Sequence, residues 1–493
     1  MASDSSRALD DVVAAVAQAR PHLVDPLEAV ALIESLGYTD ARMRREFGFA
    51  DTRAFGQYVF ERLSQGQIPP PKATAAPSGR GALATFGHCL GASLVYAVPW
   101  LIVVAADRAR AVSVAADLGP PLSLALMLSL VVCGGFMQAI GRRGRFYIGA
   151  NQPGLAAVVC AYFVRLGAIA TIAAAVVGLG LGWLFGLAAW PSLVLWADQF
   201  IVFCALWLTW AVLTVRDGHW RVPAAFAAGV IAFILVRLLG QSAVLAQLIA
   251  LGAVLVTAVV QVPRVFAPAN GTEKAAPVPI PRMTVVLFRE LPFVLYGTLF
   301  FAFLFAARLV GGFSRSARPE YALGADLAVL SMLVASAGVE YAGLRFAYHL
   351  AAAKEAAVAG GADAFRRAVA QVHVRALAIT TFTFVVTMAV VAAAARLLLT
   401  GAPGAVWTVL AAIDVAYVPF ALGLLNALVL FSCERPWSAI NVLIAGLVVN
   451  LGAGYALGRP AIGVLSGAIL ILVGSTRAVR RTLRRADHAV AAP

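Results

Sequence analysis

Long apolar runs dominate the chain from residue 84 onward and alternate with short polar stretches. Each run has about 20 residues or more, the length at which an α-helix crosses a hydrocarbon core of about 30 Å. Twelve runs are found, six on each side of a proline-containing break: 84–106, 117–140, 155–187, 191–215, 222–240 and 242–262, then 284–312, 326–350, 375–399, 404–432, 437–457 and 459–478. The pattern predicts an all-α polytopic membrane protein with about 12 transmembrane helices in two six-helix lobes, residues 84–263 and 283–478.

The first 66 residues have a different pattern. Leu9, Val12 and Val16 recur at helical spacing within an otherwise polar sequence, and a second short apolar helix follows. We expect a small cytoplasmic helical domain over residues 1–66. A Pro/Ala-rich linker, residues 67–83, would join it to the first membrane helix.

Composition excludes an ordinary soluble protein. Of all residues, 61% are hydrophobic and 13% are charged, whereas about a quarter of residues are charged in soluble domains. The net charge of +14 indicates nucleic-acid binding only when the basic residues form a patch on a soluble surface. Here the arginines lie in short segments between apolar runs, so no nucleic-acid partner is expected.

The basic residues predict the orientation, because cytoplasmic loops of membrane proteins are enriched in Lys and Arg. Alternate polar segments carry most of them: Arg142, Arg143 and Arg145; Arg216 and Arg221; Arg264, Lys274 and Arg282; Lys354, Arg366, Arg367 and Arg375; Arg435; and Arg477, Arg480, Arg481, Arg484 and Arg485. The inter-lobe linker 264–282 and the basic tail 479–493 are therefore predicted to be cytoplasmic, with both termini. A strong preference for Arg over Lys suggests a bacterium with a GC-rich genome, and hence the bacterial inner membrane.

Ionisable side chains within the apolar runs are the candidate site residues, since each costs roughly 2.5–3.5 kcal/mol at the centre of a membrane helix on insertion scales. The candidates for a substrate or ion pathway are Arg165, Asp198, Arg237, Arg289, Glu290, Glu340, Arg345 and Asp414. Arg237, Arg289 and also Arg308 lie near enough to helix ends to serve as interfacial anchors. We expect Arg165, Asp198, Glu340 and Asp414 to face the interior of the bundle.

Two interpretations of these residues stay open. Arg165 and Asp198, on consecutive helices, would form a structural ion pair or contact a substrate. An arginine-lined cavity would suit a pyrophosphate-linked lipid or an acidic glycan, because a guanidinium binds phosphate with two hydrogen bonds, while Glu340 and Asp414 would carry protons or bind a driving cation. The histidines and cysteines lack metal-ligand spacing, and no catalytic residue, cofactor or metal is expected.

Several segments resemble a known family. The stretch from Arg289 reads Arg-Glu-Leu-Pro-Phe-Val-Leu-Tyr-Gly, and Glu340, Arg345 and Tyr348 precede a charged stretch that ends near Arg375. An earlier Gly-Gly-Phe-Met-Gln segment comes before two arginines, and an Arg-rich helix ends the chain. Over roughly residues 84–488 the chain resembles Pel-type exopolysaccharide transporters of the multidrug/oligosaccharidyl-lipid/polysaccharide (MOP) flippase superfamily.

Two departures from the family pattern stand out. Ala307 precedes Arg308 where an acidic residue is expected, which puts any borrowed ion-coupling residue in doubt, and the N-terminal segment is an addition. The resemblance implies a two-lobed alternating-access carrier, and not an enzyme, that exports a polysaccharide or lipid-linked saccharide. It also implies glycosyltransferase or membrane partner subunits, for which residues 1–66 offer a docking point.

Three other functions stay open beside this one. They are a multidrug-type efflux carrier, a non-transporting scaffold of a polysaccharide synthase, and an integral-membrane glycosyl- or acyltransferase. The enzyme is the least favoured, because the sequence has no Asp-x-Asp motif and no long extramembrane loop in which to build an active site.

Overall fold

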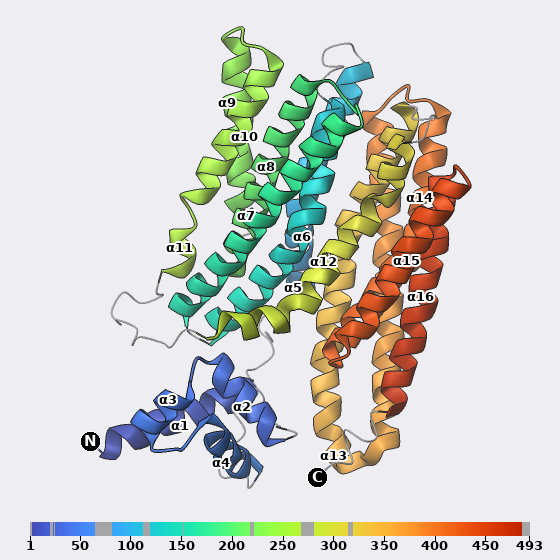
Figure 1. Cartoon of the computed structure of the whole chain (residues 1–493). Coiled ribbons are helices and arrows are strands. Elements are labelled where there is room, and N and C mark those ends of the chain that lie inside the picture. Colours follow the sequence, from blue (N-terminus) through green and yellow to red (C-terminus); the bar gives the residue numbers. More distant parts are fainter. Residues whose placement is uncertain are drawn as a thin grey trace.

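The computed structural model describes residues 2–19, 23, 25–64, 81–111, 119–150, 152–216, 221–267, 281–313 and 319–485, and within them every regular element is a helix (Figure 1). Eleven helices in these ranges are long and apolar enough to cross a membrane, and α5 adds a shorter apolar helix, Ala82–Leu94. The prediction of an all-α polytopic membrane protein is confirmed.

The first lobe contains six long helices. They are α5 (Ala82–Ala111), α6 (Gly119–Gly149), α7 (Pro153–Leu184), α8 (Trp190–Leu213), α9 (Arg221–Leu238) and α10 (Ala243–Val259), followed by the short α11 (Pro263–Phe266). The second lobe contains α12 (Met283–Phe313), α13 (Pro319–Leu398), α14 (Gly404–Ser432), α15 (Pro436–Ala456) and α16 (Pro460–Arg485).

The N-terminal residues fold into a small helical domain. It contains α1 (Ala2–Ala19), α2 (Pro26–Ser35), the short α3 (Asp40–Arg42), a π-helical turn over Met43–Phe47, and α4 (Thr52–Ser64). Val13, Ile33 and Phe55 are fully buried in its core. The Asp25 side chain accepts a hydrogen bond from the Glu28 N–H at 2.8 Å and so caps α2.

The domain lies at one end of the helical bundle, which we call the basal end; the opposite end is the distal end (Figure 1). Most of the predicted linkers 67–83 and 264–282 lies outside the described residues. The first part of the predicted basic tail, residues 479–485, is helical, because α16 continues to Arg485.

Two pairs of helices join the lobes. Helix α5 packs against α13, and α6 packs against α12. Within each lobe the contacts correspond, since α6 packs on α8 as α13 does on α14, and α9 packs on α10 as α15 does on α16. Exchanging α5 with α12 and α6 with α13 therefore converts one inter-lobe pair into the other. This is the arrangement expected of two structurally related halves with a site between them.

Helix α13 is a hairpin with two limbs, Glu320–Leu350 and Phe365–Leu398. Phe346 and Leu350 of the first limb share a buried cluster with Phe365 and Val369 of the second, and Figure 1 shows the limbs turning at the basal end. The predicted runs 326–350 and 375–399 and their connector thus form one helical unit.

Two helices extend further at the basal end than their apolar runs predict. Helix α6 continues past residue 140 to Gly149, so Arg142, Arg143 and Arg145 lie on a helix and not in a loop. In α12, Pro292 stands inside the helix, where it removes a backbone hydrogen bond and bends the axis. The residues before it cross the basal end beneath the first lobe (Figure 1).

Candidate functional site

Glu340 lies at the meeting point of the two lobes. Cys89 and Tyr96 of α5, Arg145 of α6 and Tyr296 of α12 all lie within electrostatic range of its carboxylate. Its side chain is nevertheless exposed. Because this exposed side chain has residues of both lobes around it, we infer a solvent-accessible crevice between the lobes and call it the Glu340 crevice.

Polar and aromatic contacts between α5 and α13 position Glu340. The hydroxyls of Ser93 and Ser336 lie 3.0 Å apart, one helical turn from Glu340. Next to Glu340, the ring of Tyr341 meets that of Phe86 edge-on with centroids 5.7 Å apart. These contacts fix the rotation of α13 and therefore the direction in which Glu340 points.

The other wall of the crevice carries cationic and aromatic groups. The guanidinium of Arg142 lies 3.5 Å from the ring centroid of Phe293 on α12, a favourable cation–π geometry. The rings of Phe293 and Tyr296 lie 4.5 Å and 5.2 Å from the ring of Phe431 on α14. Arg142 and Arg145 are both exposed. Arg145, Tyr96 and Tyr296 lie within electrostatic range of Glu340, and Arg142 lies beside Phe293, one helical turn from Tyr296.

Glu290 lies in a buried ion pair between the lobes. Its carboxylate is fully buried and lies 2.5 Å from Arg143 Nε and 3.5 Å from Arg142 Nη1. The pair joins α6 to α12 across the lobe interface near the basal end. Breaking a buried ion pair by removal of one partner is strongly destabilising. We call this contact the Glu290–Arg143 latch.

Asp414 is buried within the second lobe. The Ser331 hydroxyl donates a hydrogen bond of 3.4 Å to one carboxylate oxygen, and the other oxygen has no hydrogen-bond partner among the described residues. A buried ion pair lies nearby, with Arg308 Nε 3.0 Å from Asp326 Oδ1. Tyr417 lies within electrostatic range of both Asp326 and Asp414. Burial of a carboxylate without a cationic partner is costly, which makes Asp414 a candidate site for a proton or a cation.

Arg165 and Asp198 are exposed on the surface of the first lobe, so the expectation that they face the bundle interior is wrong. They also form no ion pair in the described part of the chain. Helices α7 and α8 are antiparallel, and the residue opposite Gly178 is Trp196. Asp198 is therefore level with about residue 176 of α7, ~16 Å along the axis from Arg165 at 1.5 Å per residue.

The remaining candidates lie at helix ends. Arg237 is exposed and donates a 2.6 Å hydrogen bond to the carbonyl of Gln241, just past the end of α9, which is the anchoring role expected of a cation at a helix C-terminus. Arg345 is exposed near the basal end of α13. Arg289 is half-buried, within electrostatic range of Glu34 in the N-terminal domain.

No family model and no curated protein matches the chain, but solved structures do. A mutant form of the Vibrio cholerae MATE transporter VcmN matches with a TM-score of 0.53 at 15% identity, covering 82% of this chain and 96% of that one. A eukaryotic MATE transporter, AtDTX14, gives 0.57 at 13% identity with coverage of 83% and 99%. The chain has the MATE transporter fold.

One further matching structure is itself described as a member of the predicted superfamily. A multidrug resistance MATE transporter described as a member of the MOP superfamily, in an outward-facing conformation, also matches, with a TM-score of 0.53, 15% identity, and coverage of 85% of this chain and 98% of that one. The matches cover almost the whole of each MATE structure. The unmatched part of this chain is comparable in size to the N-terminal domain and its linker. The Pel-type resemblance stays a prediction.

Within the MATE fold, sequence reasoning missed four of the crevice residues: Tyr96, Arg142, Arg145 and Tyr296. The arginines follow an apolar run and were assigned to a loop. One signal was available, since Tyr147 continues the apolar face of α6 seven residues, or about two turns, after Ile140, and both are fully buried. The tyrosines resemble ordinary membrane-helix residues until the partner helices are known.

Proposed function

We propose that this protein is an alternating-access carrier that exports an anionic lipid-linked saccharide or polysaccharide across a bacterial inner membrane. The basal end would face the cytoplasm, as the arginine distribution predicts. The Glu340 crevice is the observation that carries the proposal, because it lies between the lobes whose relative movement would expose it to either side.

The chemistry of the crevice suits this cargo. Arg142 and Arg145 supply guanidinium groups, which bind phosphate or carboxylate with paired hydrogen bonds. Tyr96 and Tyr296 offer aromatic faces for the apolar side of a sugar ring and hydroxyls for its polar edge. Glu340 would accept hydrogen bonds from sugar hydroxyls and attract the guanidinium of Arg145 towards the centre of the crevice.

Asp414 would couple transport to an ion gradient. It lies inside the second lobe, away from the arginines of the crevice, and one of its oxygens is left without a hydrogen bond. Binding and release of a proton or cation there would change the packing between α13, which carries Ser331, and α14. Since α13 also carries Glu340, the two sites share one rigid helix.

Multidrug efflux is the second candidate. The observation that favours it is the combination of Glu340 with aromatic side chains, which would also bind an amphiphilic cation. The two exposed arginines in the same crevice oppose a cationic cargo. A cationic drug would have to displace or avoid them, whereas an anionic saccharide would use them.

The test compares secreted polysaccharide and intracellular lipid-linked glycan in a deletion strain complemented with wild type, Arg145→Ala or Arg165→Ala. We expect the deletion and Arg145→Ala to lose secretion and accumulate the lipid-linked precursor, while Arg165→Ala, on the outer surface, matches wild type. Unchanged glycan in every strain, with increased drug sensitivity of the deletion, would favour efflux. Unchanged glycan and drug sensitivity would favour a scaffold.

A further inference from the structure

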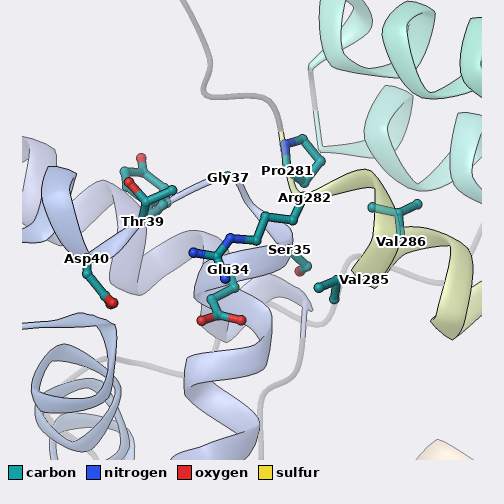
Figure 2. A pocket seen from close by; sticks show the side chains of 10 residues that line it. Glu34, Ser35, Gly37, Thr39, Asp40, Pro281, Arg282, Val285 and Val286 are labelled. Carbon is teal, nitrogen blue, oxygen red and sulfur yellow. The ribbon is translucent and has the colours of Figure 1, made fainter.

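The N-terminal domain docks against helices of both lobes. The Tyr147 hydroxyl of α6 donates a 3.1 Å hydrogen bond to the carbonyl of Ser35 at the end of α2. On the other side, residues 34–40 of the domain share a small pocket with Arg282, Val285 and Val286 at the beginning of α12 (Figure 2). One domain thus contacts both members of the α6–α12 pair.

The contact has an apolar centre with charges around it. Tyr147 and Val286 are buried, at 0% and 2% exposure, and burial of apolar surface is stabilising. Figure 2 shows the Arg282 side chain extending towards Glu34 from the α12 side. Arg282 also lies within electrostatic range of the Asp40 carboxylate, and Glu34 lies within electrostatic range of the Arg289 guanidinium.

Net charge agrees with this docking. Residues 1–64 contain ten acidic and seven basic side chains, whereas the rest of the chain contains 14 acidic and 31 basic ones. An acidic domain therefore lies against a basic membrane-embedded part. Attraction between exposed charges is weak for any one pair, but it favours this face of the bundle over others.

The docking position has a mechanical consequence. Helices α6 and α12 belong to different lobes, so any movement of one lobe relative to the other changes their separation at the basal end. The Glu290–Arg143 latch already joins them at this level. The domain contacts the same two helices just beyond that latch, through a separate set of residues.

We infer that the N-terminal domain is an autoinhibitory clamp, which holds the basal ends of α6 and α12 together and restrains the movement of the lobes until it is released. A competing ligand for the Glu34–Asp40 face, such as a partner subunit with a basic surface, would release it. The inference rests on the proposed function, because a restraint on the lobes matters only to an alternating-access carrier.

The test measures distances between spin labels in the full-length protein in lipid nanodiscs. One pair, at Leu187 and Leu457, reports the separation of the lobes at the distal end; a second, at Arg53 and Leu187, reports docking of the domain. All these sites are introduced as Leu→Cys or Arg→Cys changes in a Cys433→Ser background, since the other four cysteines are buried. No cargo is added, so an error in the proposed substrate does not affect the result.

Arg282→Glu places a third acidic group beside Glu34 and Asp40 and is expected to release the domain. The lobe pair should then gain a second distance population that wild type lacks. Adding Glu34→Arg to Arg282→Glu should restore docking and the single population. Arg264→Glu, on α11 outside the docking face, is the matched control and should behave as wild type.

Two results would overturn the inference. In one, the domain is released in Arg282→Glu but the distance between the lobes stays as in wild type. In the other, the domain stays docked both in Arg282→Glu and in the double variant Arg282→Glu with Tyr147→Phe. The contacts of Arg282 and Tyr147 would then not be what holds the domain. Unchanged saccharide secretion in the deletion strain, together with the expected response of the labels, would instead contradict only the proposed cargo.

Discussion

Arg143 of α6 and Glu290 of α12 are joined across the lobe interface, with Nε 2.5 Å from a carboxylate oxygen that is completely inaccessible to solvent. Arg142, one residue earlier, lies 3.5 Å from the same carboxylate and stacks on Phe293. A residue that closes the interface is therefore adjacent to one that lines the crevice. The inter-lobe contact and the proposed site therefore share this short segment of α6.

Glu290→Gln is expected to destabilise the protein by about 3 kcal/mol, because removal of one partner leaves a buried charge uncompensated. Thermal unfolding in detergent, followed by the fluorescence of buried tryptophans, measures the change. The reversed pair, Arg143→Glu with Glu290→Arg, should recover part of the loss. Equal midpoints for Glu290→Gln and wild type would show that the latch does not stabilise the interface.

Glu340→Gln should reduce export while membrane insertion and the unfolding midpoint stay as in wild type. The side chain is exposed in the crevice, so the amide loses the charge without creating a buried unpaired group. Export by cells with matched protein levels measures the effect. Arg165→Ala serves as the control, and comparable export from Glu340→Gln and this control would remove the crevice from the transport pathway.

Gly135→Ala is expected to separate α6 from α12 and to destabilise the protein by about 1–3 kcal/mol, the usual range for overpacking. A Cβ at this position would collide with the backbone carbonyl oxygen of Val294, which cannot move as a side chain does. Gly91→Ala on α5 is the control, since its Cβ would meet no atom within 4 Å. The unfolding midpoint of Gly135→Ala should be clearly lower than that of Gly91→Ala.

Asp414→Asn should preserve the fold but abolish the dependence of transport on an ion gradient. The amide has the shape of the protonated acid and keeps the contact with Ser331, yet it cannot release a proton or hold a cation. Transport into vesicles with and without an imposed gradient measures this. Gradient-dependent transport in Asp414→Asn would place the coupling group elsewhere.

The stability of the N-terminal domain should fall in acid because of Asp40. Hydrogen bonds from the Thr52 N–H at 2.9 Å and the Thr52 hydroxyl at 2.7 Å lower the pKa of this carboxyl below its ordinary value of 3.8. A lowered folded-state pKa stabilises the domain fully above the unfolded value, and this contribution disappears as the pH falls through the folded one.

Hydrogen exchange at the start of α4 in the full-length protein tests this expectation. Wild type should be better protected than Asp40→Asn at pH 6, and the difference should diminish below about pH 4, where the unfolded-state carboxyl begins to protonate. Asp51→Asn, which removes a charge but not the Asp40 contact, provides the comparison. About pH 3 lies below the pKa of the unfolded-state carboxyl. If wild type and Asp40→Asn still differed in protection there as much as at pH 6, the role of Asp40 would be contradicted.

Much of the architecture was readable in the sequence. The apolar runs predicted the membrane helices because burial in lipid requires about 20 apolar residues regardless of neighbours, and helical spacing in residues 1–66 predicted the small domain. Ionisable residues within the runs pointed to Glu340 and Asp414. None of this required knowledge of which helices meet.

The tertiary structure alone decided which of these residues share a site. Lipid and protein interior are both apolar, so hydropathy could not show that Arg165 lies on the outer surface while Glu340 lies in a crevice. Nor could it show that α6 carries Arg142 and Arg145 past the end of its apolar run to meet α5, α12 and α13. The sequence determined which segments enter the membrane, because that depends on each segment's own transfer free energy. Pairing of the lobes depends on the shapes of surfaces far apart in the chain, and only the folded protein brings those surfaces together.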